Sequence, residues 1–204
     1  MDKKINNNGY EYVDLGLPSG TLWSTQNVGA SKPSDTGLYF QWGDTQGYTA
    51  DQLGKDKQFN WNDYKWNPSG DGKTFTKYTT PSEALELEDD AANANMGGDW
   101  HMPNPKQIQE LIDNTTSEWI TLDGVNGMKF TSKKNKLKSI FIPAAGIAWN
   151  GSINGSGLYG DIWSSMLNMN YADVGQYIDL SVVGVLIEYG YYRDNGLSIR
   201  GVIG

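Results

Sequence analysis

The side chains that most often carry out catalysis are scarce in this chain of 204 residues. It has no cysteine and a single histidine, His101, which excludes thiolate chemistry, a Ser-His-Asp triad and a zinc site built from several histidines. The neighbours of His101 are Trp100 and Met102, and such large apolar neighbours predict a packed structural residue. The remaining candidates for chemistry are carboxylates and glycine-rich turns.

Four carboxylates form the one dense acidic cluster, Glu86, Glu88, Asp89 and Asp90. Paired carboxylates can act as acid and base or can hold calcium. Acidic side chains are also typical of the first turn of a helix, where they meet the positive end of the helix dipole. The structural interpretation is favoured, and a catalytic site around Glu88, Asp89 and Asp90 stays as the alternative.

Two glycine-rich stretches imitate nucleotide-binding motifs. Residues 155–160 match GxGxxG, but residues 161–165 after them predict a strand where the dinucleotide fingerprint needs a helix. Residues 67–74 resemble a phosphate-binding loop that lacks its first glycine, and no helix follows. The same stretch resembles a calcium-binding loop in its spacing, but Tyr78 stands where that loop needs a glutamate ligand. Both stretches are predicted to be turns.

Charge and hydropathy exclude further classes of partner. The net charge is −8 and the only arginines are Arg193 and Arg200, so binding to nucleic acid is not expected. No apolar run is long enough for direct membrane insertion. Residues 1–9 lack the apolar core of a signal peptide. The lysine cluster at residues 133–138 predicts a solvated hairpin turn.

The last third of the chain has the composition of a combining surface. No lysine occurs after residue 138, and Asn, Gly, Ser and Tyr are dense at residues 148–159 and 188–195. Tyrosine supplies contact area at low entropic cost, and the small polar residues supply adaptable hydrogen bonds, as in binding loops.

Named residues in these segments, and in the stretch at residues 166–174 between them, are candidate ligand contacts. Clustered exposed aromatic side chains mark binding patches. For residues 182–187, a buried strand is at least as good an interpretation as a ligand-binding surface. Contact area is expected from Trp149, Tyr171, Tyr189, Tyr191 and Tyr192. Directional hydrogen bonds are expected from Asn150, Asn154, Asn168, Asn170, Asp173, Glu188 and Asp194.

Short strands must position these residues. Alternating apolar residues and turn punctuation predict strands. The segments are residues 10–15, 21–24, 38–42, 118–122, 127–131, 139–142, 161–165, 177–183 and 197–202. The strands at 127–131 and 139–142 are expected to pair across the lysine turn. Residues 43–80 predict a long loop packed by its own aromatic side chains.

Helical signals are confined to the middle of the chain. One short helix is expected within residues 83–95, ended by Gly97 and Gly98. A second follows Asn104, a predicted N-cap that can form a capping box with Gln107, with Pro105 at the first helical position. The apolar residues at 108, 111 and 112 then share one face.

Two helices among short antiparallel strands define an α+β class. A polar tail at residues 1–9 and a single domain at residues 10–204 are expected. The motifs, in chain order, are residues 12–23 (YVDLGLPSGTLW), 27–30 (NVGA), 37–43 (GLYFQWG), 89–92 (DDAA), 97–103 (GGDWHMP), 141–146 (FIPAAG), 162–165 (IWSS) and 196–200 (GLSIR).

Together these motifs resemble the C-type-lectin-fold domains of the Bacteroidetes and Fibrobacter paralogous type. Such domains are related to formylglycine-generating-enzyme-like domains and to the variable proteins of diversity-generating retroelements. The resemblance covers about residues 10–203. It implies two helices with a twisted, mainly antiparallel sheet, termini near each other, and a variable face on the C-terminal strands and loops.

The chain departs from the catalytic and metal-binding branches of this fold. It lacks the cysteines that hold copper in formylglycine-generating enzymes and the histidines that hold iron in sulfoxide synthases. Of the calcium-lectin signature it keeps only Trp61-Asn62-Asp63, far upstream of the expected place. Neither enzymatic activity nor a metal or other cofactor is therefore expected.

The functional expectation is a non-catalytic ligand-binding domain with a variable C-terminal surface. It would be a retroelement-diversified receptor or adhesin of a cell or phage surface, and its ligand a protein or a glycan. The alternatives are an enzyme on the same fold with the carboxylate site described above, or a structural domain of a pilus or tail fibre. The oligomeric state is not indicated.

Overall fold

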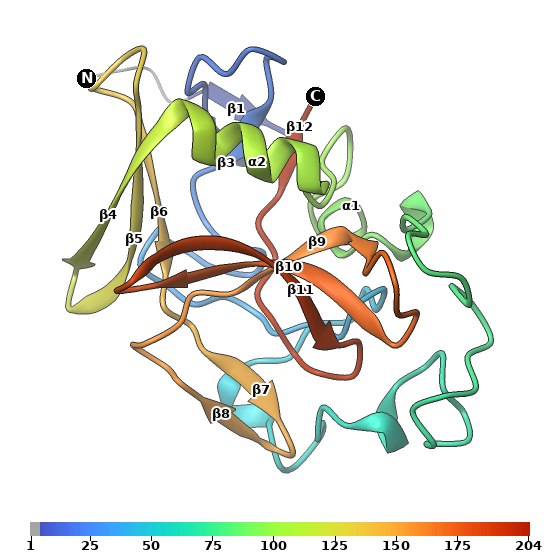
Figure 1. Ribbon diagram of the computed structural model, residues 1–204. Helices are drawn as coiled ribbons and strands as arrows, with labels where there is room; N and C mark the ends of the chain where they lie inside the picture. Colours follow the sequence, from blue (N-terminus) through green and yellow to red (C-terminus); the bar gives the residue numbers. More distant parts are fainter. Residues whose placement is uncertain (1–4) are drawn as a thin grey trace.

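A computed structural model describes residues 5–204, and most of its regular structure is β-sheet (Figure 1). The first sheet has the order β1-β2-β3-β12, with antiparallel neighbours. Its strands are β1 (Ile5–Asn7), β2 (Tyr10–Val13), β3 (Leu22–Ser24) and β12 (Val202–Ile203). Since this sheet contains the first and the last described strands, the two ends of the fold lie close together. The expected tail at residues 1–9 is therefore wrong in part, because residues 5–7 form β1.

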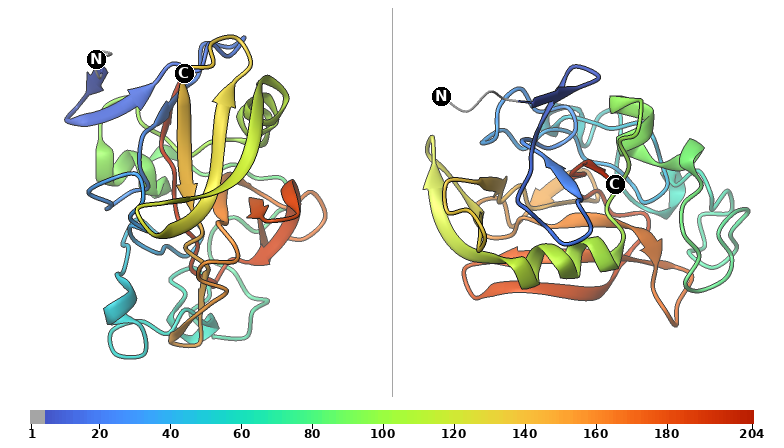
Figure 2. Two further views of the ribbon diagram at one scale, coloured as in Figure 1. Left: turned by 90° about the vertical axis from the view of Figure 1, so that its left-hand side faces the viewer. Right: turned by 90° about the horizontal axis from the view of Figure 1, so that it is seen from above.

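The second sheet carries most of the lysine-free segment. Its order is β11-β10-β9, again antiparallel. The strands are β9 (Ile162–Leu167), β10 (Val174–Ser181) and β11 (Gly184–Tyr192). Helix α2 (Pro105–Asn114) lies along one face of this sheet (Figure 2). There Ile108 and Leu111 pack with Ile162, Ile178 and Leu180 in a buried cluster.

A third sheet and a hairpin complete the β structure. The sheet has the order β4-β5-β6, formed by β4 (Thr115–Leu122), β5 (Val125–Ser132) and β6 (Ser139–Pro143). Strands β5 and β6 pair antiparallel across residues 133–138, so the predicted lysine hairpin is confirmed. The hairpin of β7 (Ile147–Trp149) and β8 (Ser152–Asn154) stands apart, at the bottom of Figure 1.

Within the described residues there are two α-helices, α1 (Ala91–Met96) and α2. The start of α2 is as predicted: the Asn104 side chain accepts a hydrogen bond from the Gln107 backbone amide, and the Gln107 side chain accepts one from the Asn104 backbone amide. Helix α1 is shorter than expected. It begins only after Asp90, whose carboxylate accepts a bond from the Asn93 amide, and it ends at Gly97 with a φ of 69°. A sheet-rich structure with two helices is consistent with the predicted α+β class.

The long segment at residues 43–80 contains little regular structure, as predicted. It has two single-turn 3-10 helices, η1 (Ala50–Gln52) and η2 (Trp61–Asp63), and a third, η3 (Leu87–Asp89), lies just beyond it. Its aromatic rings pack edge to face, as Trp61 does on Tyr64 and Trp66 does on Tyr78. The expected strands at 38–42 and 197–202 form isolated bridges, such as Phe40 with Leu197, and only the end of the second becomes β12.

Candidate ligand-binding site

A hollow of about 600 Å³ lies between the end of β7, the start of β10 and the end of β11. We call it the aromatic pocket. It is lined by Trp149, Tyr171, Asp173, Val174, Gly190, Tyr191, Tyr192 and Asn195. These residues come from the end of β7, the β9–β10 loop, the start of β10, the end of β11 and the turn after it. Its size is that of a typical ligand site, and four of the eight lining residues are aromatic.

An irregular strand pairing shapes this pocket. The pairing of β10 with β11 shifts register between Gly175 and Tyr177, which marks a β-bulge. Bulges twist a strand locally and redirect its side chains. Gly175 faces Tyr191 across the ladder, and a Cβ atom there would lie 2.9 Å from the rings of both Trp163 and Trp42. Glycine is therefore required for the backbone to lie this close to the two buried rings.

Gly190 is a second position where the pocket depends on a missing side chain. A Cβ atom at Gly190 would lie 1.8 Å from Cγ1 of Val174. We expect Gly190→Ala to lower the free energy of unfolding by about 1–3 kcal/mol, because valine is stiff and the clash must be relieved by the backbone. Denaturant titration checks this. Adding Val174→Ala to the same variant should recover part of the loss; strictly additive losses would contradict the clash.

The aromatic side chains of the pocket are braced by further rings. Tyr191 stacks at an angle on Tyr177, with centroids 4.6 Å apart, and Tyr177 meets Trp163 edge to face. Tyr192 meets Trp61 of the long loop edge to face at 5.9 Å. Burial, followed by the carboxyls of Asp161 and Asp179, raises the pKa of Tyr191 to about 12. The tyrosine hydroxyl is therefore a neutral hydrogen-bonding group at physiological pH.

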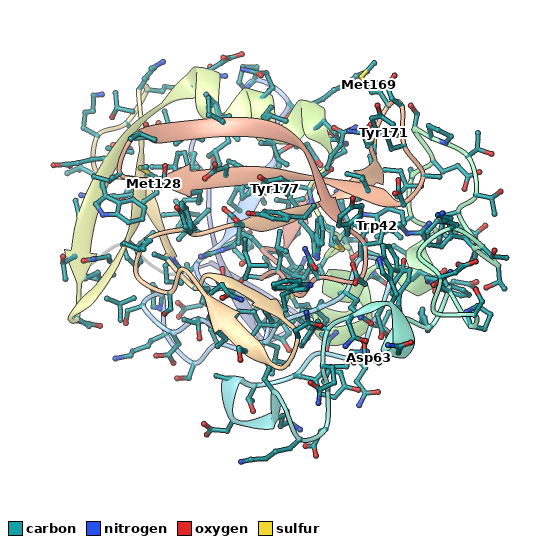
Figure 3. The ribbon with its side chains drawn as sticks, turned by 60° about the horizontal axis from the view of Figure 1, so that its bottom comes forward. Trp42, Asp63, Met128, Met169, Tyr171 and Tyr177 are labelled. Atoms are coloured by element: carbon teal, nitrogen blue, oxygen red, sulfur yellow. The ribbon has the colours of Figure 1, made fainter. Side chains whose placement is uncertain are left out.

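The pocket brings together several of the predicted contact residues. Trp149, Tyr171 and Tyr192 are exposed, by 50%, 63% and 54%, and Tyr191 and Asp173 are half-buried. Figure 3 shows Tyr171 and Met169 on the loop beyond β9, with Tyr177 in the body of the sheet. Four of the five predicted aromatic contacts, Trp149, Tyr171, Tyr191 and Tyr192, thus line one hollow.

Other predicted contacts lie outside the pocket lining. Asn150 and Asn154 are exposed on the β7–β8 hairpin, and the side-chain oxygen of Asn150 accepts a 3.3 Å hydrogen bond from the side-chain amide of Asn60. Asn170 is exposed on the β9–β10 loop. Glu188 and Tyr189 belong to β11, but their side chains lie outside the part of the chain that the structure describes.

For two predicted contacts the surface role is wrong, because the fold buries them. Asn168 is 3% exposed, and its side-chain oxygen accepts bonds from the backbone amides of Asn170 and Tyr171. It builds the turn that presents Tyr171. Asp194 is also 3% exposed, and burial raises its pKa to about 7. Both residues shape the loops from inside.

Sequence reasoning missed three lining residues, Val174, Gly190 and Asn195. Gly190 and Asn195 flank the predicted tyrosines, and they contributed to the composition of residues 188–195 without being named as contacts. The signal for Val174 was absent from the local sequence, because its place in the pocket follows from the β10–β11 pairing.

A buried arginine fixes the wall behind the pocket. The Arg193 guanidinium donates to the Tyr64 hydroxyl at 2.7 Å and to the backbone carbonyls of Tyr78, Ala172 and Lys77 at 2.8 to 3.1 Å. It also lies over four rings, those of Trp42, Tyr64, Phe75 and Tyr78. Burial lowers its pKa. Arg193 ties the long loop at residues 43–80 to the end of β11.

The acidic cluster has structural partners. Oxygens of Glu86, Glu88 and Asp89 lie within 4.8 Å of one another, and the Lys77 ammonium lies among them at 2.5, 3.1 and 2.6 Å. Hydrogen bonds to Asp89 and Glu86 raise the pKa of Lys77. Asp90 caps α1 and also accepts a bond from the Met102 amide. The alternative carboxylate site is thus filled by a cation from the protein itself.

The other rejected motifs are turns in the structure. Residues 155–160 lead into strand β9, and Asp71 closes the turn at residues 67–74 by accepting bonds from the amides of Lys73 and Thr74. His101 is half-buried, with its ring bonded to the Asp99 carbonyl. None of the described helices has the length and apolar character needed to cross a membrane.

Comparison of the chain with family models, with curated proteins and with solved structures found no match in any of the three.

Proposed function

We propose that this chain is a non-catalytic ligand-binding domain of the C-type lectin fold, whose variable C-terminal surface holds the ligand in the aromatic pocket. The observation that carries the proposal is convergence. Trp149, Tyr171, Tyr191 and Tyr192 come from three separate segments of the lysine-free region, and all four line one hollow. Exposed aromatic clusters of this kind mark binding sites.

The architecture supports the choice of fold. Two helices accompany mainly antiparallel sheets, and the first and last described strands lie in the same sheet. Each of these features is implied by the resemblance to C-type-lectin-fold domains.

The distribution of burial supports a variable surface on a constant scaffold. The motif segments at residues 141–146 and 196–200 are buried throughout. Between them, residues 169–171 are exposed and residues 172–174 are half-buried, and these have no counterpart in the motifs. Side chains there can change with little loss of packing, as targeted diversification requires. A reverse transcriptase gene nearby, with an adenine-rich copy of the C-terminal coding segment, would support this part; its absence would contradict it.

The pocket is tested by replacing its two most exposed tyrosines. We expect Tyr171→Ala with Tyr192→Ala to weaken binding by about 30-fold or more, since aromatic hot spots contribute at least about 2 kcal/mol. The free energy of unfolding should change little, because both rings are mostly solvent-exposed. Ligands are first selected with the unmodified protein from a glycan array and a displayed peptide library.

A matched control is Leu137→Ala, an 86% exposed residue on the lysine turn. It should keep every ligand that the unmodified protein selects. Equal affinities for the double variant and the control would show that the pocket is not the site.

A further inference from the structure

The aromatic pocket has a single charged side chain in its lining, and it is negative. Asp173 is that residue. Among the described residues, no lysine or arginine forms an ion pair with its carboxylate. The adjacent Arg193 contacts Asp173 only through the backbone, by donating its amide hydrogen to the Asp173 carbonyl, while its guanidinium is directed to other acceptors. The carboxylate is therefore available to a ligand.

Exposed aromatic rings line the same pocket as this carboxylate. Trp149, Tyr171 and Tyr192 are each at least half exposed, and the face of an aromatic ring carries a negative quadrupole. Lysine ammonium and arginine guanidinium groups bind over such faces, most strongly over tryptophan. The lining thus combines the two elements that recognise an organic cation, aromatic faces and one acidic group.

The overall charge of the chain also favours a cationic ligand. The whole chain carries a charge of −8, and both of its arginines are completely buried. The molecule as a whole therefore attracts cations.

An exposed basic residue, Lys73, also lies near Asp173. Lys73 borders a neighbouring hollow that Asp173 also lines, but the two side chains form no ion pair. Lys73 therefore leaves the carboxylate unneutralised and provides a variant by which the local charge can be changed.

We propose that the aromatic pocket binds a lysine or arginine side chain of a protein partner, with the cationic group over the rings and beside Asp173. The charge complementarity of the pocket selects a basic peptide segment over a neutral glycan. A volume of about 600 Å³ exceeds that of one side chain, so neighbouring residues of the segment also fit. This inference rests on the proposed function, because it names the ligand class of the same pocket.

The test uses the full chain and fluorescently labelled peptides of equal length that contain lysine, arginine, glutamine or glutamate at two central positions. We expect the lysine and arginine peptides to bind and the glutamine and glutamate peptides to bind at least tenfold more weakly. Asp173→Asn should weaken the basic peptides at least tenfold, and Lys73→Gln should strengthen them. Raising the salt concentration should weaken binding of the basic peptides.

General attraction to an acidic protein is separated from recognition by Asp99→Asn. This exposed residue lies outside the pocket lining, and its replacement gives the same net charge as Asp173→Asn. The control should bind the basic peptides as the unmodified protein does. Equal losses for the two variants would overturn the proposal, as would equal binding of the glutamine peptide or no binding of any peptide.

A neutral oligosaccharide array run in parallel distinguishes this failure from failure of the proposed function. In one outcome, the unmodified protein binds a neutral glycan and the double variant Tyr171→Ala with Tyr192→Ala fails to bind it. This result would preserve the proposed ligand-binding function and overturn the assignment of a cationic ligand. An unchanged affinity of that double variant for every selected ligand would overturn both.

Discussion

Replacement of Arg193 with methionine should lower the free energy of unfolding by about 4 kcal/mol or more, because it leaves several buried acceptors unsatisfied at about 1–3 kcal/mol each. These acceptors are the Tyr64 hydroxyl and three backbone carbonyls. The contacts of the guanidinium with four rings are lost as well. Urea denaturation followed by circular dichroism measures the change.

The conservative variant Arg193→Lys separates charge from geometry. Lysine keeps the positive charge but cannot direct donors to all four acceptors at once. We expect Arg193→Lys to lower the free energy of unfolding by more than half as much as Arg193→Met does. A loss below about 1 kcal/mol for either variant is the size of an ordinary surface effect and would show that Arg193 does not anchor the loop.

The same anchor connects folding to the proposed site. Arg193 follows Tyr192 directly, and its partners Tyr64, Lys77 and Tyr78 all belong to the long loop. Tyr192 in turn packs on Trp61 of that loop. Loosening the loop therefore removes the support of a pocket ring, so a folded Arg193 variant should also bind pocket ligands less tightly.

Local sequence signals were sufficient wherever one segment determines its own structure. The capping box at Asn104 and Gln107 places the start of α2, because both bonds are made within four residues. The lysine hairpin followed in the same way, since β5 and β6 are joined by a short polar turn. These elements required no information from distant residues.

Prediction was incomplete in two hairpins whose glycine, asparagine and tyrosine residues have the composition of a loop. Strand β11 runs to Tyr192 through residues read as a surface loop, because β10 supplies its hydrogen bonds. Strands β7 and β8 were missed for the same reason, as glycine and asparagine obscure a three-residue pairing. Composition therefore predicted several lining residues of the candidate pocket, whereas the shape of the pocket depends on the register shift between Gly175 and Tyr177.

Burial of polar residues was the least predictable property. Asn168 and Asp194 are residue types that are common in surface contacts, yet both are buried. The Asn168 side chain accepts hydrogen bonds from the backbone of its own loop. No sequence pattern distinguishes an asparagine that binds a ligand from one that binds the backbone two residues away. Only the path of the chain decides between the two roles.

Replacement of Asp161 with asparagine should make the protein more stable at pH 8 and leave it nearly unchanged at pH 4. Asp161 is 1% exposed, and its Oδ1 has no hydrogen-bond partner among the described residues. Burial, followed by the neighbouring Asp179 carboxyl, raises its pKa from 3.8 to about 8. Asparagine has nearly the same shape and carries no charge at either pH.

The direction in which stability changes with pH follows from proton linkage. Between pH 3.8 and about 8 the folded protein keeps a proton on Asp161 that the unfolded chain has released. Stability therefore falls with rising pH through this window and levels off above it. Each unit of pKa shift corresponds to about 1.4 kcal/mol, so we expect a gain of at least about 2 kcal/mol for Asp161→Asn at pH 8.

Denaturant titrations of both proteins at intervals from pH 4 to pH 9 measure the difference, which should widen steadily up to about pH 8 and then remain constant. Asp99→Asn serves as the control at an exposed aspartate and should show no such widening. A constant difference across the whole range would mean that the carboxyl of Asp161 is ionised in the folded protein and that burial does not raise its pKa.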